Sequence, residues 1–126
     1  MTKLNSYLSL IRFYNPIGFW LLLWPGLWGL FLSDNFNIEN FTIVVLGSFL
    51  TRSLGCAIND FLDKDFDKSV ERTKNRPIAS KELSLSEAGI FIILLACVCI
   101  FLLLQTNPYT IKLVSYIAIP MIILYP

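Results

Sequence analysis

The apolar residues of the chain are gathered into four long blocks rather than spread at the spacing of an amphipathic surface helix. The blocks run over about residues 16–32, 41–59, 88–104 and 109–125, and their lengths approach the roughly 20 residues that a helix needs to cross a bilayer. Apolar residues make up 56% of the chain and charged residues 15%, against about 45–50% and about 25% in an average soluble domain. The pattern predicts an all-α fold, a multi-spanning transmembrane helix bundle with four helices in one domain over residues 1–126.

Lysine and arginine are distributed unevenly between the segments that connect these blocks. The segment 60–87 holds six of them, whereas 33–40 holds none. Because cytoplasmic loops carry the excess of positive residues, we expect 60–87 and both ends of the chain to be cytoplasmic. The predicted location is a bacterial inner membrane or the mitochondrial inner membrane, with the lipid bilayer as a partner. The formal net charge of +1 says little about partners. No nucleic-acid partner is expected.

The most informative polar residues lie at the end of the second block and just after it. One amide and three carboxylates share an arc of about 100° on a helical wheel: Asn59, Asp60, Asp63 and Asp67. Arg52 lies on the same face, deeper in the block, whereas Asp65 lies on the opposite side and is excluded. Like charges near a membrane boundary are costly unless a cation neutralises them. We therefore expect a cation at this face.

The residue types of the chain restrict which cation this is. There is no histidine, and the three cysteines fall inside apolar blocks without the spacing of a zinc site. Oxygen ligands favour a hard ion, above all Mg²⁺, which completes its shell with water and phosphate oxygens. The basic run Arg72, Lys74 and Arg76 would then grip phosphate. The alternative, a hydrated loop that only fixes topology, does not explain the intramembrane arginine on the carboxylate face.

At these residues the sequence resembles the UbiA superfamily of intramembrane prenyltransferases, whose first signature is Asn-Asp, two residues, Asp, three residues, Asp. The stretches RFYNPIGFWLLLWPGLW, RSLGCAIND and FDKSVERTKNRPIAS are most similar to 4-hydroxybenzoate polyprenyltransferases of ubiquinone biosynthesis. The resemblance implies an all-helical bundle that transfers a polyprenyl group from polyprenyl diphosphate to the ring carbon ortho to the hydroxyl of 4-hydroxybenzoate. It implies a Mg²⁺-dependent electrophilic aromatic substitution.

The resemblance also implies roles for individual positions. The residues that would hold Mg²⁺ and diphosphate are Asn59, Asp63 and Asp67. Asp63 and Asp67 would be the catalytic pair, with Asp60 as a helper, and Arg72 and Arg76 would assist in binding diphosphate. The candidates for the carboxylate of 4-hydroxybenzoate are Arg12 and Arg52. That assignment depends on charge complementarity and depth more than on the motif.

One departure from the family is the absence of its second aspartate motif, which faces the first across the cavity from a later helix. The sequence therefore resembles the N-terminal part of such an enzyme. With half of the metal site missing, we expect the 126 residues alone to be inactive.

Three other interpretations remain open. Other UbiA-type branches, with haem or naphthoate acceptors, share the aspartate signature, and only the flanking WPGLW and NRPIAS argue against them. The CDP-alcohol phosphotransferases also carry aspartates on membrane helices, but their glycine and Ala-Arg pattern does not occur around Asp60 to Asp67. A non-catalytic four-helix membrane subunit would use the charged segment for topology alone. Replacing Asp63 and Asp67 by Asn separates that interpretation from a metal site.

Overall fold

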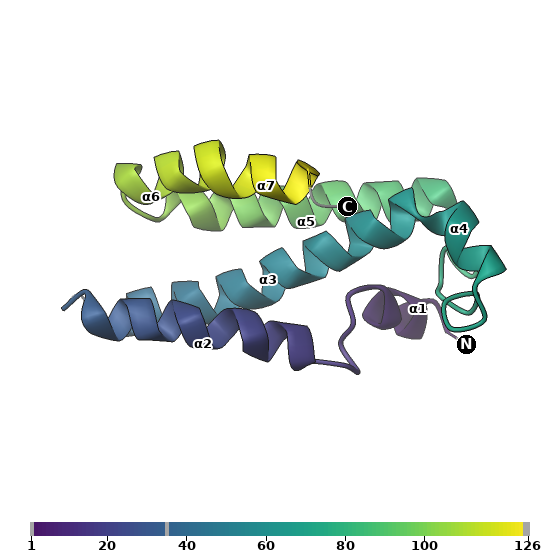
Figure 1. Ribbon diagram of the computed structural model, residues 1–126, viewed down its shortest axis with the longest axis horizontal. Coiled ribbons are helices and arrows are strands. Elements are labelled where there is room, and N and C mark those ends of the chain that lie inside the picture. The colour runs from purple at the N-terminus through teal and green to yellow at the C-terminus, as the bar shows by residue number, and fades with distance from the viewer. Residues whose placement is uncertain (1, 35, 125–126) are drawn as a thin grey trace.

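The computed structural model describes residues 2–34 and 36–124. This part of the chain is helical apart from its connecting segments and contains no strand (Figure 1). The helices are α1 (Lys3–Leu10), α2 (Ile17–Leu32), α3 (Ile38–Leu62), α4 (Lys64–Ser69), α5 (Leu85–Leu104), α6 (Pro108–Leu113) and α7 (Ile119–Leu124), with a π-helical turn at Val114–Ala118. The predicted all-α fold is confirmed, although the described residues form more helices than four.

α3 is the central helix of the fold. It packs against α2 and α5, and near its C-terminal end it also contacts α1 and α4 (Figure 1). The most buried apolar cluster lies beneath this end of α3 and consists of Leu10, Ala57, Ile78, Leu83 and Ala88. The core therefore sits under the charged segment rather than midway along the bundle.

The starts of the two longest helices are set by capping residues. The Asn37 side chain accepts a hydrogen bond from the backbone N–H of Asn40 at the start of α3. At the start of α5, the Ser84 hydroxyl accepts from the N–H of Glu87, and the Glu87 carboxylate accepts from the N–H of Ser84. This reciprocal capping box satisfies donors that the first helical turn leaves free. It also fixes where the long connection after α4 ends.

The outer surface of the helices is strongly apolar. α3 and α5 are long and apolar enough to cross a membrane, and α2 is apolar but shorter. Large apolar side chains are exposed along α5, among them Ile90, Ile93 and Phe101. A continuous exposed surface of this kind is disfavoured in water. It suits contact with lipid or with further protein.

The connection between α3 and α5 differs from the loop expected over 60–87. α3 continues to Leu62, beyond the expected end at 59, and α4 follows directly. The chain turns at Asp63, whose φ of −92° and ψ of 12° end α3 and begin α4. α1 is another helix that the apolar blocks do not predict, because it is short and half of its residues are polar.

The fourth apolar block, expected as one helix over 109–125, is helical from Pro108 to Leu124 and contains a π turn. In the π turn that separates α6 from α7, the N–H of Ile119 bonds to the carbonyl of Val114. Pro120 follows at once, and a proline has no N–H and clashes with the carbonyl four residues earlier. The wider π turn accommodates this clash. The expected end at Tyr125 lies outside the described residues.

Candidate functional site

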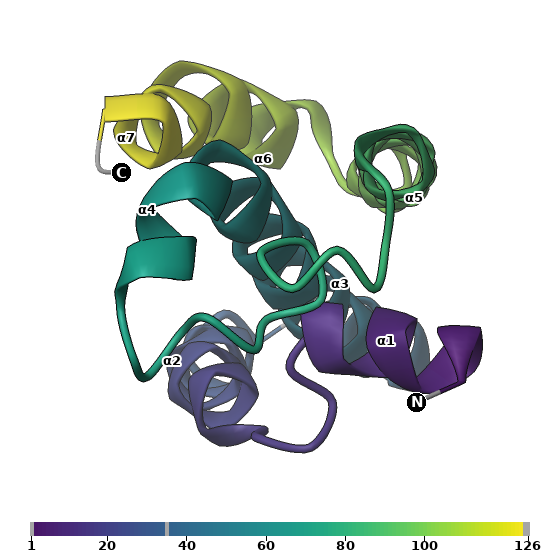
Figure 2. The ribbon, with the colours of Figure 1, turned by 90° about the vertical axis from the view of Figure 1, so that its right-hand side faces the viewer.

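The charged side chains gather at one end of the bundle. We define the polar end as α1, the last turn of α3, α4 and the segment 70–84 (Figure 2). Although 70–84 is irregular, it is anchored: the N–H of Leu83 donates to the carbonyl of Pro77 at 3.1 Å, and the Thr73 hydroxyl donates to the carbonyl of Asp67 at 3.0 Å. The side chains of Pro77 and Leu83 are fully buried. The segment is therefore a fixed wall of the polar end and not a freely hydrated loop.

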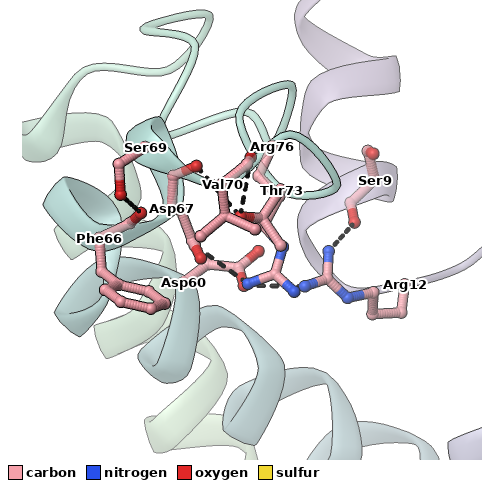
Figure 3. A network of polar contacts seen from close by, with 9 residues as sticks. All are labelled: Ser9, Arg12, Asp60, Phe66, Asp67, Ser69, Val70, Thr73 and Arg76. Atoms are coloured by element: carbon pink, nitrogen blue, oxygen red, sulfur yellow. Dashed lines mark hydrogen bonds and ion pairs between the residues drawn. The ribbon is translucent and has the colours of Figure 1, made fainter.

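Asp60 is the centre of this region. Its side chain is 1% exposed, and its Oδ1 accepts hydrogen bonds from Nη2 of Arg12 at 2.8 Å and from Nη1 of Arg76 at 3.0 Å (Figure 3). Charge-assisted bonds of this kind are roughly twice as strong as neutral ones. A carboxylate this deeply buried would be unstable without such partners. Asp60 is thus paired with two guanidinium groups that lie 64 positions apart in the sequence.

Asp67 joins the same network through Arg76. Its side chain is 5% exposed, and its Oδ2 accepts from Nη1 of Arg76 at 3.0 Å. One guanidinium nitrogen therefore bridges two carboxylates that come from different helices, α3 and α4 (Figure 3). The sequence predicted that these two aspartates share a helical face. The structure brings them together, through the turn at Asp63 and through Arg76.

Arg12 reaches Asp60 from an unusual backbone conformation. Its φ of 59° lies in the left-handed region, which non-glycine residues seldom adopt and which stores strain. The turn directs the chain from α1 into α2 and aims the guanidinium at the polar end. α1 itself is tied down by an ion pair between Lys3 and Glu87 and by a hydrogen bond from the Ser6 hydroxyl to Glu82 at 3.1 Å. These contacts hold Arg12 in place.

The remaining predicted ligands have different surroundings. Asn59 is exposed and Asp63 is half-buried, and neither side chain makes a hydrogen bond or ion pair with another described residue. Arg72 and Lys74 are exposed, and Lys74 pairs with Glu71 at 2.7 Å. These side chains border the network of buried charges without belonging to it.

The donors at the polar end fit a magnesium ion in part. The side-chain atoms that could act as metal ligands there are all oxygens, which Mg²⁺ prefers. Among them, Oδ2 of Asp60 is buried with no hydrogen-bond partner. A buried orphan oxygen is costly unless a donor or cation reaches it. Over residues 2–34 and 36–124, however, no three acidic or cysteine side chains lie close enough to surround one ion. The residues fit an ion that takes one or two carboxylates here and its other ligands from water or phosphate.

Arg52 occupies a second polar position, deeper along α3. It lines a small cavity of about 20 Å³ together with Arg12, Asn15, Phe19 and Phe49. That volume is enough for about one water molecule, so a larger ligand would bind at the mouth. Arg52 is exposed there and makes no hydrogen bond or ion pair with any other described residue. The two phenylalanine rings meet edge to face with centroids 6.0 Å apart and form an apolar wall.

Comparison with known protein families identifies the family of the chain. The model of the UbiA prenyltransferase family matches residues 22–126. The chain belongs to this family. As a member with apolar helices long enough to span a bilayer, it is a membrane protein built as a helical bundle, as the apolar blocks predicted. Membership also excludes the CDP-alcohol phosphotransferase interpretation.

Individual members of the UbiA family match almost the whole chain. The 4-hydroxybenzoate octaprenyltransferase of Polynucleobacter asymbioticus is 42% identical over 126 residues, 98% of this chain and 44% of the relative. The protein of the same name from Vesicomyosocius okutanii is 50% identical, with 92% and 43% covered. The one from Pseudomonas aeruginosa is 43% identical, with 96% and 41% covered. The chain thus spans less than half the length of these relatives. No solved structure matches it.

Sequence reasoning missed several parts of the polar end. Thr73 is 5% exposed and holds the segment 70–84 to α4, although nothing in its spacing marks it. Ser6 and Glu82, which fasten α1, were also missed. A signal for α1 was present, since Thr2 precedes the helix and caps it by accepting from the N–H of Asn5. The partners could not be found because they lie far apart in the chain.

Proposed function

We propose that the complete gene product to which this chain belongs transfers a polyprenyl group from polyprenyl diphosphate to 4-hydroxybenzoate, with the polar end as one side of its diphosphate site. The observation that carries the proposal is the convergence of Asp60, Asp67 and Arg76 at the end of an apolar bundle. The names of the relatives support the acceptor and the polyprenyl donor. The whole reaction is assigned to the complete protein and not to these residues alone.

Magnesium is the proposed cofactor, held by Asn59, Asp63 and Asp67, with Oδ2 of Asp60 as a further ligand. Bound there, it would supply positive charge that stabilises the departing diphosphate. Asp63 is the best entry point for a cation, because its half-buried side chain has no ion pair with any residue that the structure describes. Asp67 would have to share its charge with Arg76. The orphan Oδ2 of Asp60 gives this aspartate a larger role than its sequence position suggests.

Arg76 is proposed to bind phosphate oxygens while it remains attached to the carboxylates. Both of its ion pairs use Nη1, and a guanidinium has five N–H donors in a rigid fork. The donors on Nη2 and Nε are therefore available to a diphosphate without dismantling the network. Arg72 and Lys74, which are exposed on the same segment, would add positive charge around the leaving group.

The carboxylate of 4-hydroxybenzoate is assigned to Arg52 in preference to Arg12. Both were candidates from the sequence, but Arg12 already pairs with Asp60. Arg52 has no partner among the described residues and lies beside the rings of Phe19 and Phe49. A guanidinium can bind a carboxylate through two parallel hydrogen bonds, and an apolar wall suits an aromatic ring.

The orientation in the membrane is proposed from the charge distribution. The N-terminal helix and the segment 70–84 lie at the same end of the bundle (Figure 2), and the segment carries the excess of lysine and arginine. We place this end in the cytoplasm by the positive-inside rule. The polyprenyl chain would then lie against apolar helix surfaces within the bilayer.

The test is an Asp63→Asn substitution in the complete gene product, assayed for Mg²⁺-dependent prenylation of 4-hydroxybenzoate. Loss of one preorganised electrostatic group typically lowers the rate about 100- to 1000-fold. Because the side chain of Asp63 makes no hydrogen bond or ion pair with another described residue, the melting temperature should not change. Asp65→Asn, at an exposed position two residues away, is the matched control. Unchanged activity in Asp63→Asn would show that the Asp63 carboxylate is not part of a metal site. No prenylation by the wild-type protein would support a non-catalytic membrane subunit, and preferred use of a naphthoate acceptor would support another branch of the family.

A further inference from the structure

Gly18 lies in the first turn of α2, where glycine has no evident advantage for helix formation. Glycine is one of the least favourable residues inside a helix. A Cβ atom built at Gly18 would lie 2.5 Å from Cζ and 2.7 Å from Nη2 of Arg52, and closer still to Nε. Comfortable carbon contacts begin at about 3.5 Å. The guanidinium of Arg52 therefore occupies space that only glycine leaves open.

Packing, and not a polar partner, sets the position of this guanidinium. Arg52 forms no hydrogen bond or ion pair with the other described residues, so nothing else fixes its long side chain in one rotamer. Its neighbours at the cavity include the apolar Phe19 and Phe49 and the polar Arg12 and Asn15, and neither polar side chain bonds to it. The backbone of α2 at Gly18 is thus the surface against which the guanidinium rests.

We propose that Gly18 is a positioning residue that holds Arg52 against α2, and thereby sets the affinity of the protein for the carboxylate of its aromatic acid substrate. The inference rests on the proposed function for the acid, and it assigns to Gly18 a role that no motif assigns. Gly18 does not touch the substrate. It acts through the direction in which Arg52 presents its N–H donors.

The direct test is Gly18→Ala in the complete gene product. Alanine is a better helix former than glycine, and the atoms it meets are the far end of a flexible side chain, so the fold should tolerate the change while Arg52 swings away. A displacement of about 1 Å can cost up to about 100-fold in a positioned site. We expect KM for 4-hydroxybenzoate to rise about 10- to 100-fold, with kcat and KM for the polyprenyl diphosphate unchanged.

The same helix offers a matched control. A Cβ at Gly29 would meet nothing within 4 Å, so Gly29→Ala makes the same chemical change without touching Arg52 and should leave all kinetic constants unchanged. A double variant separates positioning from general damage. Gly18→Ala should have no further effect on KM once Arg52 has been replaced by alanine. An effect that persists in the Arg52→Ala background would overturn the proposal, as would wild-type kinetics in Gly18→Ala itself.

A measurement that does not depend on turnover keeps the proposal distinct from the proposed function. Phenylglyoxal modifies exposed guanidinium groups, and its reaction with Arg52 can be followed by peptide mass spectrometry. We expect Gly18→Ala to change the rate of Arg52 modification severalfold, with Gly29→Ala equal to wild type. Equal rates in all three proteins would show that Gly18 does not position Arg52. If the wild-type protein prenylates no aromatic acid, the assigned function fails, and the labelling alone then decides the contact.

Discussion

Asp60 and Arg52 lie about two helical turns apart on α3, but their charged side chains differ in burial and in ion pairing. Asp60 is 1% exposed and is bound by two guanidinium groups. Arg52 is exposed and has no ion pair among the described residues. A buried charge with ion-pair partners contributes to the fold, because removing one charge of the pair leaves the other charge buried and uncompensated. A charge without a partner beside apolar rings contributes little to stability and is available to a ligand.

The largest effect should follow the removal of the buried carboxylate. Asp60→Ala leaves Arg12 without its ion pair and Arg76 with only Asp67. Breaking a buried ion pair from one side typically costs about 3–5 kcal/mol, so denaturant unfolding in detergent should show a loss of this size. The control is Asp63→Ala, because the half-buried side chain of Asp63 has no partner among residues 2–34 and 36–124. Equal stability of the two variants would mean that the network around Asp60 does not hold the polar end.

Arg52→Ala should reverse that pattern. Because this side chain has no hydrogen-bond or ion-pair partner in the part of the chain that the structure describes, the free energy of unfolding should change by no more than about 0.5 kcal/mol. Hydrogen bonds to charged groups contribute about 1.5–3 kcal/mol, so the affinity for 4-hydroxybenzoate should fall about 10- to 100-fold. Isothermal titration with 4-hydroxybenzoate measures this directly. A stability loss like that of Asp60→Ala, without weaker binding, would erase the contrast between the two positions.

The long helices could be read from the sequence because they depend on local composition. The apolar blocks locate α2, α3 and α5, since a long apolar run suits a helix in lipid whatever its neighbours are. The short helices could not be read in the same way. α1 depends on contacts with residues more than 70 positions away, such as Ser6 with Glu82. The π turn before Pro120 is a local irregularity within a continuous helical run that the apolar pattern does not reveal.

For the site, the sequence revealed which residue types meet but not which pairs they form. Asp60, Asp67, Arg12 and Arg76 were all named from charge and spacing. The sequence assigned the aspartates to a metal and the arginines to substrates, whereas the structure pairs them with one another. Arg12 and Asp60 are 48 positions apart, and no local pattern connects them. Pairing across that distance is a property of the folded chain.

The strained turn at Arg12 gives a smaller prediction. Arg12→Ala and Arg12→Gly both remove the ion pair with Asp60, but only glycine adopts a φ near 59° without penalty. The left-handed conformation costs an L-residue about 1–2 kcal/mol. The glycine variant should therefore be more stable than the alanine variant by about 1 kcal/mol, measured by denaturant unfolding of both. If alanine were the more stable, the turn would not be strained at this position.

The smallest effect is expected at Asp65, which was excluded from the site because it lies on the opposite side of the helical wheel. Its side chain is 81% exposed and pairs with Lys68 at 3.4 Å. Exposed ion pairs contribute about 0–1 kcal/mol, so Asp65→Asn should change the free energy of unfolding by no more than that. Salt sharpens the comparison, because the Debye length falls from about 10 Å at 0.1 M to about 3 Å at 1 M. The Asp65 effect should vanish in high salt while the Asp60 effect persists, since buried pairs are screened far less.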